Sequence, residues 1–183
     1  MTATSALGGL VVLDLSHALA GPFASTMLGD YGAEILKIEP LEGEISRAWG
    51  PPFYGGESSY FVNLNRNKKS VALDLKHPEG RALFFRLLDG ADIVLENLRV
   101  GTVKKLGIDY ERARERQPRI IYCSVSGFGQ TGPYRDRPGY DVVAQGESGL
   151  MDLTGYPDQP PAKVGSSIAD IIAGLYALNG ILL

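Results

Sequence analysis

The sequence predicts an α/β fold in which helices flank a mostly parallel sheet. Short apolar runs of strand length alternate with longer amphipathic segments, and glycine or proline separates most of them. Residues 10–15, Leu-Val-Val-Leu-Asp-Leu, are almost entirely apolar, which is typical of a parallel strand buried on both faces. The alternation of such strands with helices indicates right-handed crossover connections.

Local signals support the individual elements. Pro22 and Pro78 stand near the starts of two expected helices, because proline suits the first helical turn, and Gly32 ends the first of them. Residues 41–59 are polar and rich in glycine and proline, so we expect a long ordered loop or arm there. The expected strands are residues 10–15, 33–38, 70–75, 91–96 and 120–125, and the expected helices are residues 21–31, 78–88, 110–116, 140–153 and 168–183.

Composition argues against several classes of protein. The 183 residues are 44% apolar and 21% charged, as in ordinary globular proteins. The net charge of −3 argues against a nucleic-acid partner, and no apolar run reaches the ~18 residues that a membrane-spanning helix requires. The single cysteine, Cys123, and a start without a signal-peptide pattern favour a cytoplasmic location, with mitochondria the alternative for a eukaryotic source. Because the chain ends inside an apolar helical pattern, we expect it to be a piece of something longer.

Residues 127–132, Gly-Phe-Gly-Gln-Thr-Gly, match the glycine pattern of dinucleotide-binding sites and directly follow an expected strand. In such a site the third glycine lies within a helix whose amino end holds the pyrophosphate. Pro133 and Pro138 prevent such a helix from starting here. We therefore expect a mobile glycine loop instead of an NAD site.

Two clusters of basic residues allow two interpretations each. Residues 63–70 place three cations and three amide side chains just before an expected strand, as either a solvated turn or a phosphate grip. Arg99, Lys104 and Lys105 follow Glu96 at the carboxyl end of another strand, the edge where open α/β sheets bind ligands. These side chains either meet a phosphorylated ligand or are solvated.

Asp170 is the candidate catalytic residue, and it also has two interpretations. With Ser167 it resembles a capping box at the start of an apolar helix. As a carboxylate near the positive end of the helix dipole, it is expected to stay ionised at neutral pH and to be able to act as a nucleophile. Gly174, one turn later, is expected to leave room for a ligand. His17 and His77 lie in no metal-ligand spacing, so no metal site is predicted.

Together these stretches resemble the family III CoA-transferases. The matches run in order along nearly the whole chain, which makes them more specific than any single motif. They comprise residues 13–14, 20–22, 32–34, 37–40, 65–70, 91–92, 96–97, 126–129, 139–141, 165–166 and 169–170. Pro40 stands where some relatives have an arginine, so one adenine or phosphate contact is not expected here.

The resemblance implies a Rossmann-like large domain, of which residues 1–183 are the amino-terminal part, without the small domain and the carboxyl-terminal return. It implies that Asp170 attacks an acyl-CoA thioester, with succinyl-CoA a candidate donor, and that CoA passes through an aspartyl anhydride and an aspartyl thioester to a free carboxylic acid. CoA is then a substrate, no cofactor is permanently bound, and the full-length chain forms an interlocked homodimer. The implied CoA contacts are Leu19, Ala20, Leu73, Asp74, Leu75, Lys76, Asn97, Leu98, Arg99, Lys105, Pro138, Gly139, Tyr140 and Asp141.

Two alternatives remain at this point. The same fold houses alpha-methylacyl-CoA racemases, whose Gly-His-Asp motif corresponds to residues 139–141. Tyr140 replaces the histidine, and because tyrosine is a poor general base near neutral pH, this favours the transferase. The other alternative is a non-catalytic module that binds CoA or a partner, because the chain lacks half of the expected enzyme.

Overall fold

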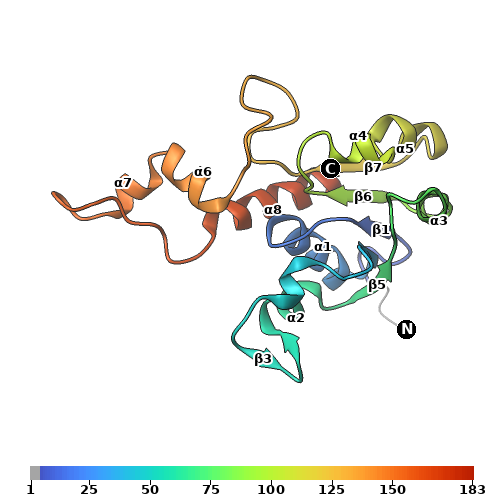
Figure 1. The fold of residues 1–183 in the computed structure, drawn as a ribbon, viewed down its shortest axis with the longest axis horizontal. Coiled ribbons are helices and arrows are strands. Elements are labelled where there is room, and N and C mark those ends of the chain that lie inside the picture. The colour runs from blue at the N-terminus through green and yellow to red at the C-terminus, as the bar shows by residue number, and fades with distance from the viewer. Residues whose placement is uncertain (1–4) are drawn as a thin grey trace.

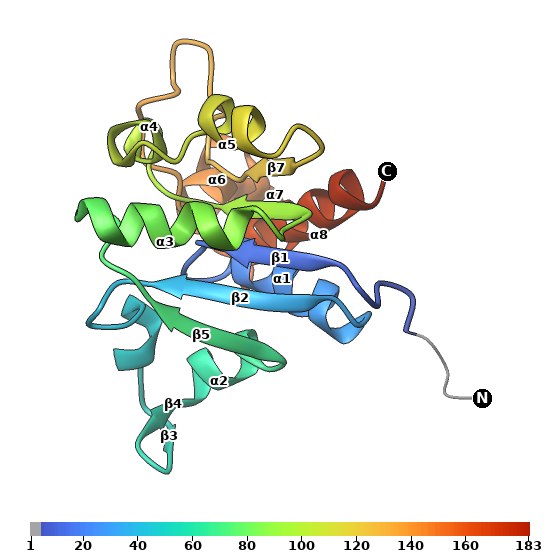
Figure 2. The ribbon, with the colours of Figure 1, turned by 90° about the vertical axis from the view of Figure 1, so that its right-hand side faces the viewer.

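The computed structural model describes residues 5–183, in which a five-stranded parallel sheet has helices on both faces (Figures 1 and 2). The strand order is β5-β2-β1-β6-β7, and each neighbouring pair is parallel. This confirms the predicted fold class. The strands of this sheet are β1 (Val11–Asp14), β2 (Glu34–Glu39), β5 (Lys68–Ala72), β6 (Ile93–Glu96) and β7 (Ile121–Ser124).

Side chains alternate between two apolar cores, one on each face of the sheet. Val12 and Leu95 belong to the core shared with α1 (Ala20–Asp30) and α8 (Ile168–Leu182). Leu13 and Val94 belong to the opposite core, which is shared with α3 (Pro78–Leu88), α4 (Thr102–Leu106) and α5 (Tyr110–Arg116). Figure 2 shows α3 in front of the strands and α1 behind them. Burial on both faces explains why the central strands are apolar at consecutive positions.

The chain reverses its direction across the sheet at the central strand. It runs from β1 outward to β2 and β5, and then returns through α3 to β6 on the other side of β1. The connections that follow β1 and β6 therefore lead away from each other. In open α/β sheets a crevice forms at this point, beyond the carboxyl ends of the strands.

Several expected boundaries were wrong. Residues 41–59 are not one loop: they contain the 3-10 helix η1 (Ile45–Ala48), the hairpin of β3 (Phe53–Tyr54) and β4 (Glu57–Ser58), and the first residue of α2 (Ser59–Asn65). The third strand lies at Lys68–Ala72 instead of residues 70–75. The helix expected at residues 140–153 is two helices, α6 (Asp141–Glu147) and α7 (Leu150–Thr154), separated at Gly149 with φ of 77°.

The glycine pattern at residues 127–132 forms no helix, as the two following prolines predicted. It opens an exposed arm whose two ends meet at Gly127 and Gly139. A Cβ atom on either glycine would collide with the backbone of the other, so both positions require glycine for this close approach. The pattern therefore serves to close a loop on itself.

Within residues 5–183, no helix is long and apolar enough to cross a membrane. Over the same residues, no three His, Cys, Asp or Glu side chains gather closely enough to hold a metal ion. The prediction about a signal peptide concerns the first residues of the chain, and residues 1–4 lie outside the described part.

Candidate active site

A cavity of about 590 Å³ lies at the carboxyl edge of the sheet, where a doubly wound fold is expected to bind its ligand. Its walls come from the segments that follow β1, β2, β5 and β6. The volume is in the range of small-molecule sites, and apolar, polar and charged residues all line it. Five of the predicted CoA contacts line it: Leu73, Asp74, Leu75, Lys76 and Leu98.

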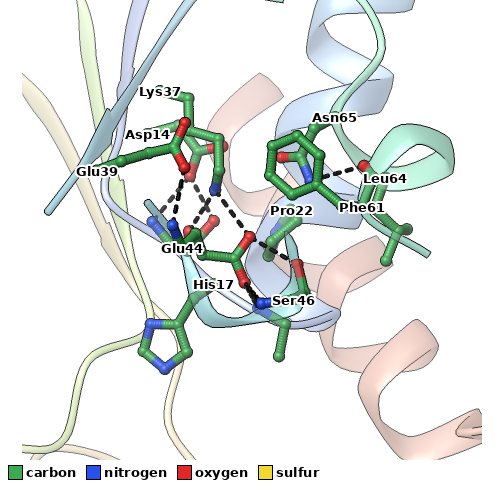
Figure 3. Close-up of polar contacts among 12 residues, drawn as sticks. Asp14, His17, Pro22, Lys37, Glu39, Glu44, Ser46, Phe61, Leu64 and Asn65 are labelled. Atoms are coloured by element: carbon green, nitrogen blue, oxygen red, sulfur yellow. Dashed lines mark hydrogen bonds and ion pairs between the residues drawn. The ribbon is translucent and has the colours of Figure 1, made fainter. Parts of the chain in front are cut away.

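Buried charges lie beside this cavity, at the ends of β1 and β2 (Figure 3). Asp14 forms an ion pair with Lys68, its Oδ2 lying 3.0 Å from Nζ, and accepts a 2.6 Å hydrogen bond from Ser25. Burial by itself would raise the pKa of Asp14, but the charges of Lys68 and Lys37, with hydrogen bonds from Ser16 and Ser25, outweigh burial and lower it well below the ordinary value. Asp14 is therefore a buried carboxylate that stays charged because cations surround it.

Lys37 links the two cavity-lining segments that follow β1 and β2. Its Nζ donates to the carbonyl oxygen of Ser16 at 2.8 Å and lies 3.5 Å from Oε2 of Glu44. Oε1 of Glu44 accepts from the backbone N–H of Ala18 at 3.0 Å, where the chain has φ of 62°. The segments after β1 and β2 are thereby joined through one buried lysine and one buried glutamate.

Glu39 extends this network toward the protein surface. It pairs with Arg47 at 2.8 Å and accepts hydrogen bonds from Ser70 at 2.6 Å and from the backbone N–H of Glu44 at 2.9 Å. Burial raises its pKa, but the hydrogen bonds from Arg47 and Ser70 prevail and lower it to about 2. Sequence reasoning missed this network, although Lys37 and Glu39 were a signal: both are charged residues at the inner end of a strand whose other residues there are apolar.

The basic stretch at residues 63–70 agrees with the solvated-turn interpretation for two of its three cations. Arg66 pairs with Asp30 at 2.5 Å, and Lys69 pairs with Glu34 at 2.7 Å. Lys68 points inward to Asp14 with its side chain only 2% exposed. Each of the three cations is thus paired with a carboxylate of the chain: Arg66 and Lys69 stay largely exposed, whereas Lys68 is buried.

Asn97, a predicted CoA contact, holds the loop that follows β1. Its Oδ1 accepts from the backbone N–H of His17 at 2.9 Å, and its Nδ2 donates to the carbonyl oxygen of His17 at 2.8 Å. His17 itself lines the cavity, and burial lowers the pKa of its imidazole. The structure therefore shows Asn97 shaping a wall through His17.

Asp170 is half-buried in the first turn of α8, as expected, but its surroundings differ from the expectation. Ser167 makes no capping hydrogen bond with its side chain, so the capping-box interpretation was wrong. Asp141 caps the helix instead, because its Oδ1 accepts from the N–H of Ala169 at 2.9 Å and faces that of Asp170 at 3.4 Å. Burial, and then the charge of Asp141, raise the pKa of Asp170, and both act against the effect of the helix dipole.

The sequence suggested that Gly174 leaves room for a ligand, but the structure shows no such space. A Cβ atom at this position would lie 2.6 Å from the carbonyl oxygen of Ala20 and 3.1 Å from Phe23. The missing side chain therefore lets α8 pack closely on α1. Ala20, another predicted CoA contact, is buried in this helix contact.

Tyr60 is within electrostatic reach of both Asp170 and Glu44. Burial, and then the charges of Asp170 and Glu44, raise its pKa to about 12. Its ring meets Trp49 edge to face, with 5.1 Å between ring centroids. Neither aromatic residue was singled out in the sequence, because α2, which carries Tyr60, had not been predicted.

The remaining predicted contacts are not gathered around the cavity. Leu19 directly precedes α1, and the side chain of Asp141 accepts a hydrogen bond from the backbone of α8. The others are exposed and absent from the cavity walls: Arg99, Lys105, Pro138, Gly139 and Tyr140. Tyr140, at the position of the racemase histidine, is 67% exposed.

The fold and the cavity define a doubly wound α/β domain with a cavity at the carboxyl edge of a parallel sheet. The sequence pattern of CoA-transferase family III matches residues 7–183, and the chain belongs to this family. Succinate--glutarate CoA-transferase of Agrobacterium fabrum is 48% identical over 182 residues, which are 96% of this chain and 46% of that protein. Human succinyl-CoA:glutarate CoA-transferase is 46% identical over 177 residues, 96% of this chain and 40% of that protein.

Solved structures agree with this assignment. A CAIB/BAIF family protein from Brucella suis superposes with a TM-score of 0.94 at 46% identity, covering 98% of this chain and 48% of that one. A protein from Mycobacterium tuberculosis gives a TM-score of 0.88 at 36% identity, covering 96% of this chain and 49% of that one. The chain thus spans about half the length of the relatives it matches.

Proposed function

We propose that the natural protein is an acyl-CoA:carboxylate CoA-transferase with Asp170 as its nucleophile. The observation that carries this proposal is a half-buried carboxylate of raised pKa at the start of α8, in a chain of this family. A carboxylate of higher pKa is a stronger nucleophile once it is ionised, and partial burial removes water that would compete with the substrate.

The reaction requires no reacting groups other than three carboxylates and the CoA thiolate. The Asp170 carboxylate attacks the thioester carbonyl of the donor, the C–S bond breaks, and a mixed anhydride and CoA thiolate form. The thiolate attacks the aspartyl carbonyl and releases the donor acid, which leaves an aspartyl-CoA thioester. The acceptor carboxylate then displaces the thiolate to give a second anhydride, and attack of the thiolate on the acyl carbonyl releases the new acyl-CoA and free Asp170.

The cavity at the sheet edge is our proposed site for part of the CoA molecule. Leu73, Leu75 and Leu98 offer apolar surface to a base or a pantetheine chain, and Lys76 offers a cation for phosphate. We propose dicarboxylic acids as substrates, with succinyl-CoA as donor, because relatives with 46–48% identity are named for succinate and glutarate.

We also propose that the full-length protein is a homodimer. α8 exposes Ile172, Leu175 and Tyr176 to the extent of 45%, 37% and 74%. Apolar side chains gathered on one helix in this way are typical of a surface that another chain segment covers.

Trapping with hydroxylamine tests the nucleophile. The full-length protein is incubated with succinyl-CoA and hydroxylamine, digested, and analysed by mass spectrometry for a hydroxamate at Asp170. We expect the modification only when succinyl-CoA is present, and we expect Asp170→Asn to abolish both modification and transfer. An active enzyme whose Asp170 is never modified would contradict the proposal.

A further inference from the structure

Gln145 is the buried centre of the contact between α6 and the start of α8. Its side chain is 1% exposed, and it lies on the helix that Figure 1 shows beside the beginning of α8. Oε1 accepts from the backbone N–H of Val164 at 2.9 Å. Nε2 donates to Oδ2 of Asp141 at 2.6 Å and faces the carbonyl oxygen of Ser166 at 3.4 Å. The segment that leads into α8 is thus fixed to α6 by one amide side chain.

Asp141 continues this connection to the backbone of the proposed nucleophile. Its Oδ2 accepts from Gln145, while its Oδ1 receives the N–H of Ala169 and points to that of Asp170. Both carboxylate oxygens are therefore engaged by donors of this chain. This is why we assign Asp141 a role that acts through Asp170, in place of the direct CoA contact that the family resemblance implied.

We propose that Asp141 and Gln145 are positioning residues for Asp170. Asp141 holds the backbone of Asp170 and places a negative charge beside its carboxylate, and Gln145 holds Asp141 in place. The inference rests on the proposed function, in which Asp170 is the nucleophile. A nucleophile in the first turn of a helix moves with that turn, so a capping carboxylate with its own buried support restricts where the attacking oxygen can lie. Near-attack geometry is sensitive to displacements of about 1 Å.

The charges that face Asp170 can be named element by element. α6 contributes Asp141, which raises the pKa of Asp170, and α2 contributes Tyr60, whose own pKa of about 12 leaves it neutral. The one titratable residue of α1, Asp30, lies at its far end and is paired with Arg66. Cys123 of β7, behind α8, is neutral because burial raises the pKa of its thiol to about 11. Asp141 is therefore the charge that raises this pKa.

Four variants of the full-length protein separate position from charge. Asp141→Asn removes the negative charge but keeps an oxygen that can accept from the backbone N–H groups of α8. Asp141→Ala removes both the charge and that oxygen. Gln145→Leu removes the hydrogen bonds that hold Asp141 and the segment before α8. Asp152→Asn is the matched control, because Asp152 lies in the first turn of α7 and is exposed. The readouts are the rate of hydroxamate formation at Asp170 with succinyl-CoA and the pH dependence of kcat/KM.

We expect Gln145→Leu and Asp141→Ala to slow hydroxamate formation by about 100-fold, the loss that a displacement of about 1 Å produces. Asp141→Asn should move the acid limb of kcat/KM to lower pH, because removing a neighbouring negative charge lowers the pKa of Asp170. Asp152→Asn should behave as wild type. If Asp141→Asn and Gln145→Leu both keep the wild-type trapping rate and acid limb, the inference is overturned. If wild-type Asp170 is not trapped at all, the proposed function fails instead.

Discussion

Lys37 and Glu44 lie 3.5 Å apart with side chains that are only 1% and 4% exposed. Burial of either charge alone would be unfavourable, and their attraction, together with hydrogen bonds to Ser16 and Ala18, offsets that cost. The pair therefore joins the segments after β1 and β2 only as long as both partners are present.

Replacing Lys37 with methionine should destabilise the protein by about 3–5 kcal/mol, because it leaves Glu44 buried without its cation. Urea unfolding measures this change. Lys69→Met is the control, because the Lys69–Glu34 pair is exposed and should contribute only about 0–1 kcal/mol. Equal losses in both variants would contradict the role of the buried pair.

Acid should weaken the protein partly through Glu39. Its pKa is lowered from 4.5 to about 2, so the folded state binds a proton less readily than the unfolded state does. The stabilisation is present above pH 4.5 and is lost as the pH falls toward 2. The gap in unfolding free energy between wild type and Glu39→Gln should therefore narrow over this range, as measured by urea titrations at several pH values. A gap that stays constant would refute the prediction.

Two glycines of α8 should respond oppositely to alanine. Gly174→Ala places Cβ 2.6 Å from the carbonyl oxygen of Ala20 and should destabilise by about 1–3 kcal/mol through overpacking. Gly180→Ala meets nothing within 4 Å and should stabilise by about 0.5–1 kcal/mol through helix propensity. Thermal unfolding of both variants tests the contrast. A stabilising Gly174→Ala would show that α1 and α8 tolerate a wider separation.

The full-length enzyme should exchange no α-proton of a 2-methylacyl-CoA into deuterated water. Tyr140, at the position of the racemase histidine, is largely exposed and is a poor general base near neutral pH. Proton NMR follows the exchange, with a known racemase as positive control. Rapid exchange would favour the racemase over the transferase.

The elements predicted correctly from the sequence are those with strong local patterns. α3 was found at residues 78–88 because Pro78 marks its start and Phe84 and Leu88 recur at helical spacing. α2 was missed because it begins in a stretch rich in glycine and proline, and the side chain of Ser58 that caps it resembles any loop serine. Local sequence gives no measure of how such short elements are supported by the rest of the fold.

The site was harder to predict than the fold because its contacts are long-range. Asp170 was identified, but its capping partner Asp141 stands 29 residues earlier, and nothing in a linear motif relates the two. Lys68 seemed to be a surface cation until the fold brought Asp14 to it from 54 residues away. The raised pKa of Asp170 was not foreseen for the same reason: the helix dipole is visible in the sequence, whereas a carboxylate on another helix is not.

The walls of the sheet-edge cavity extend along the chain from Leu15 to Leu106 and come from four separate strand ends. The residues that line the cavity are far apart in the sequence and meet only in the folded chain, so an unfolded chain is expected to have almost no affinity for a ligand of the cavity. Occupancy and folding are consequently linked equilibria. A ligand present at 100 times its Kd would add about 2.7 kcal/mol to the free energy of unfolding. A chain whose cavity is occupied in this way would therefore resist heat and proteases better than the same chain with its cavity empty.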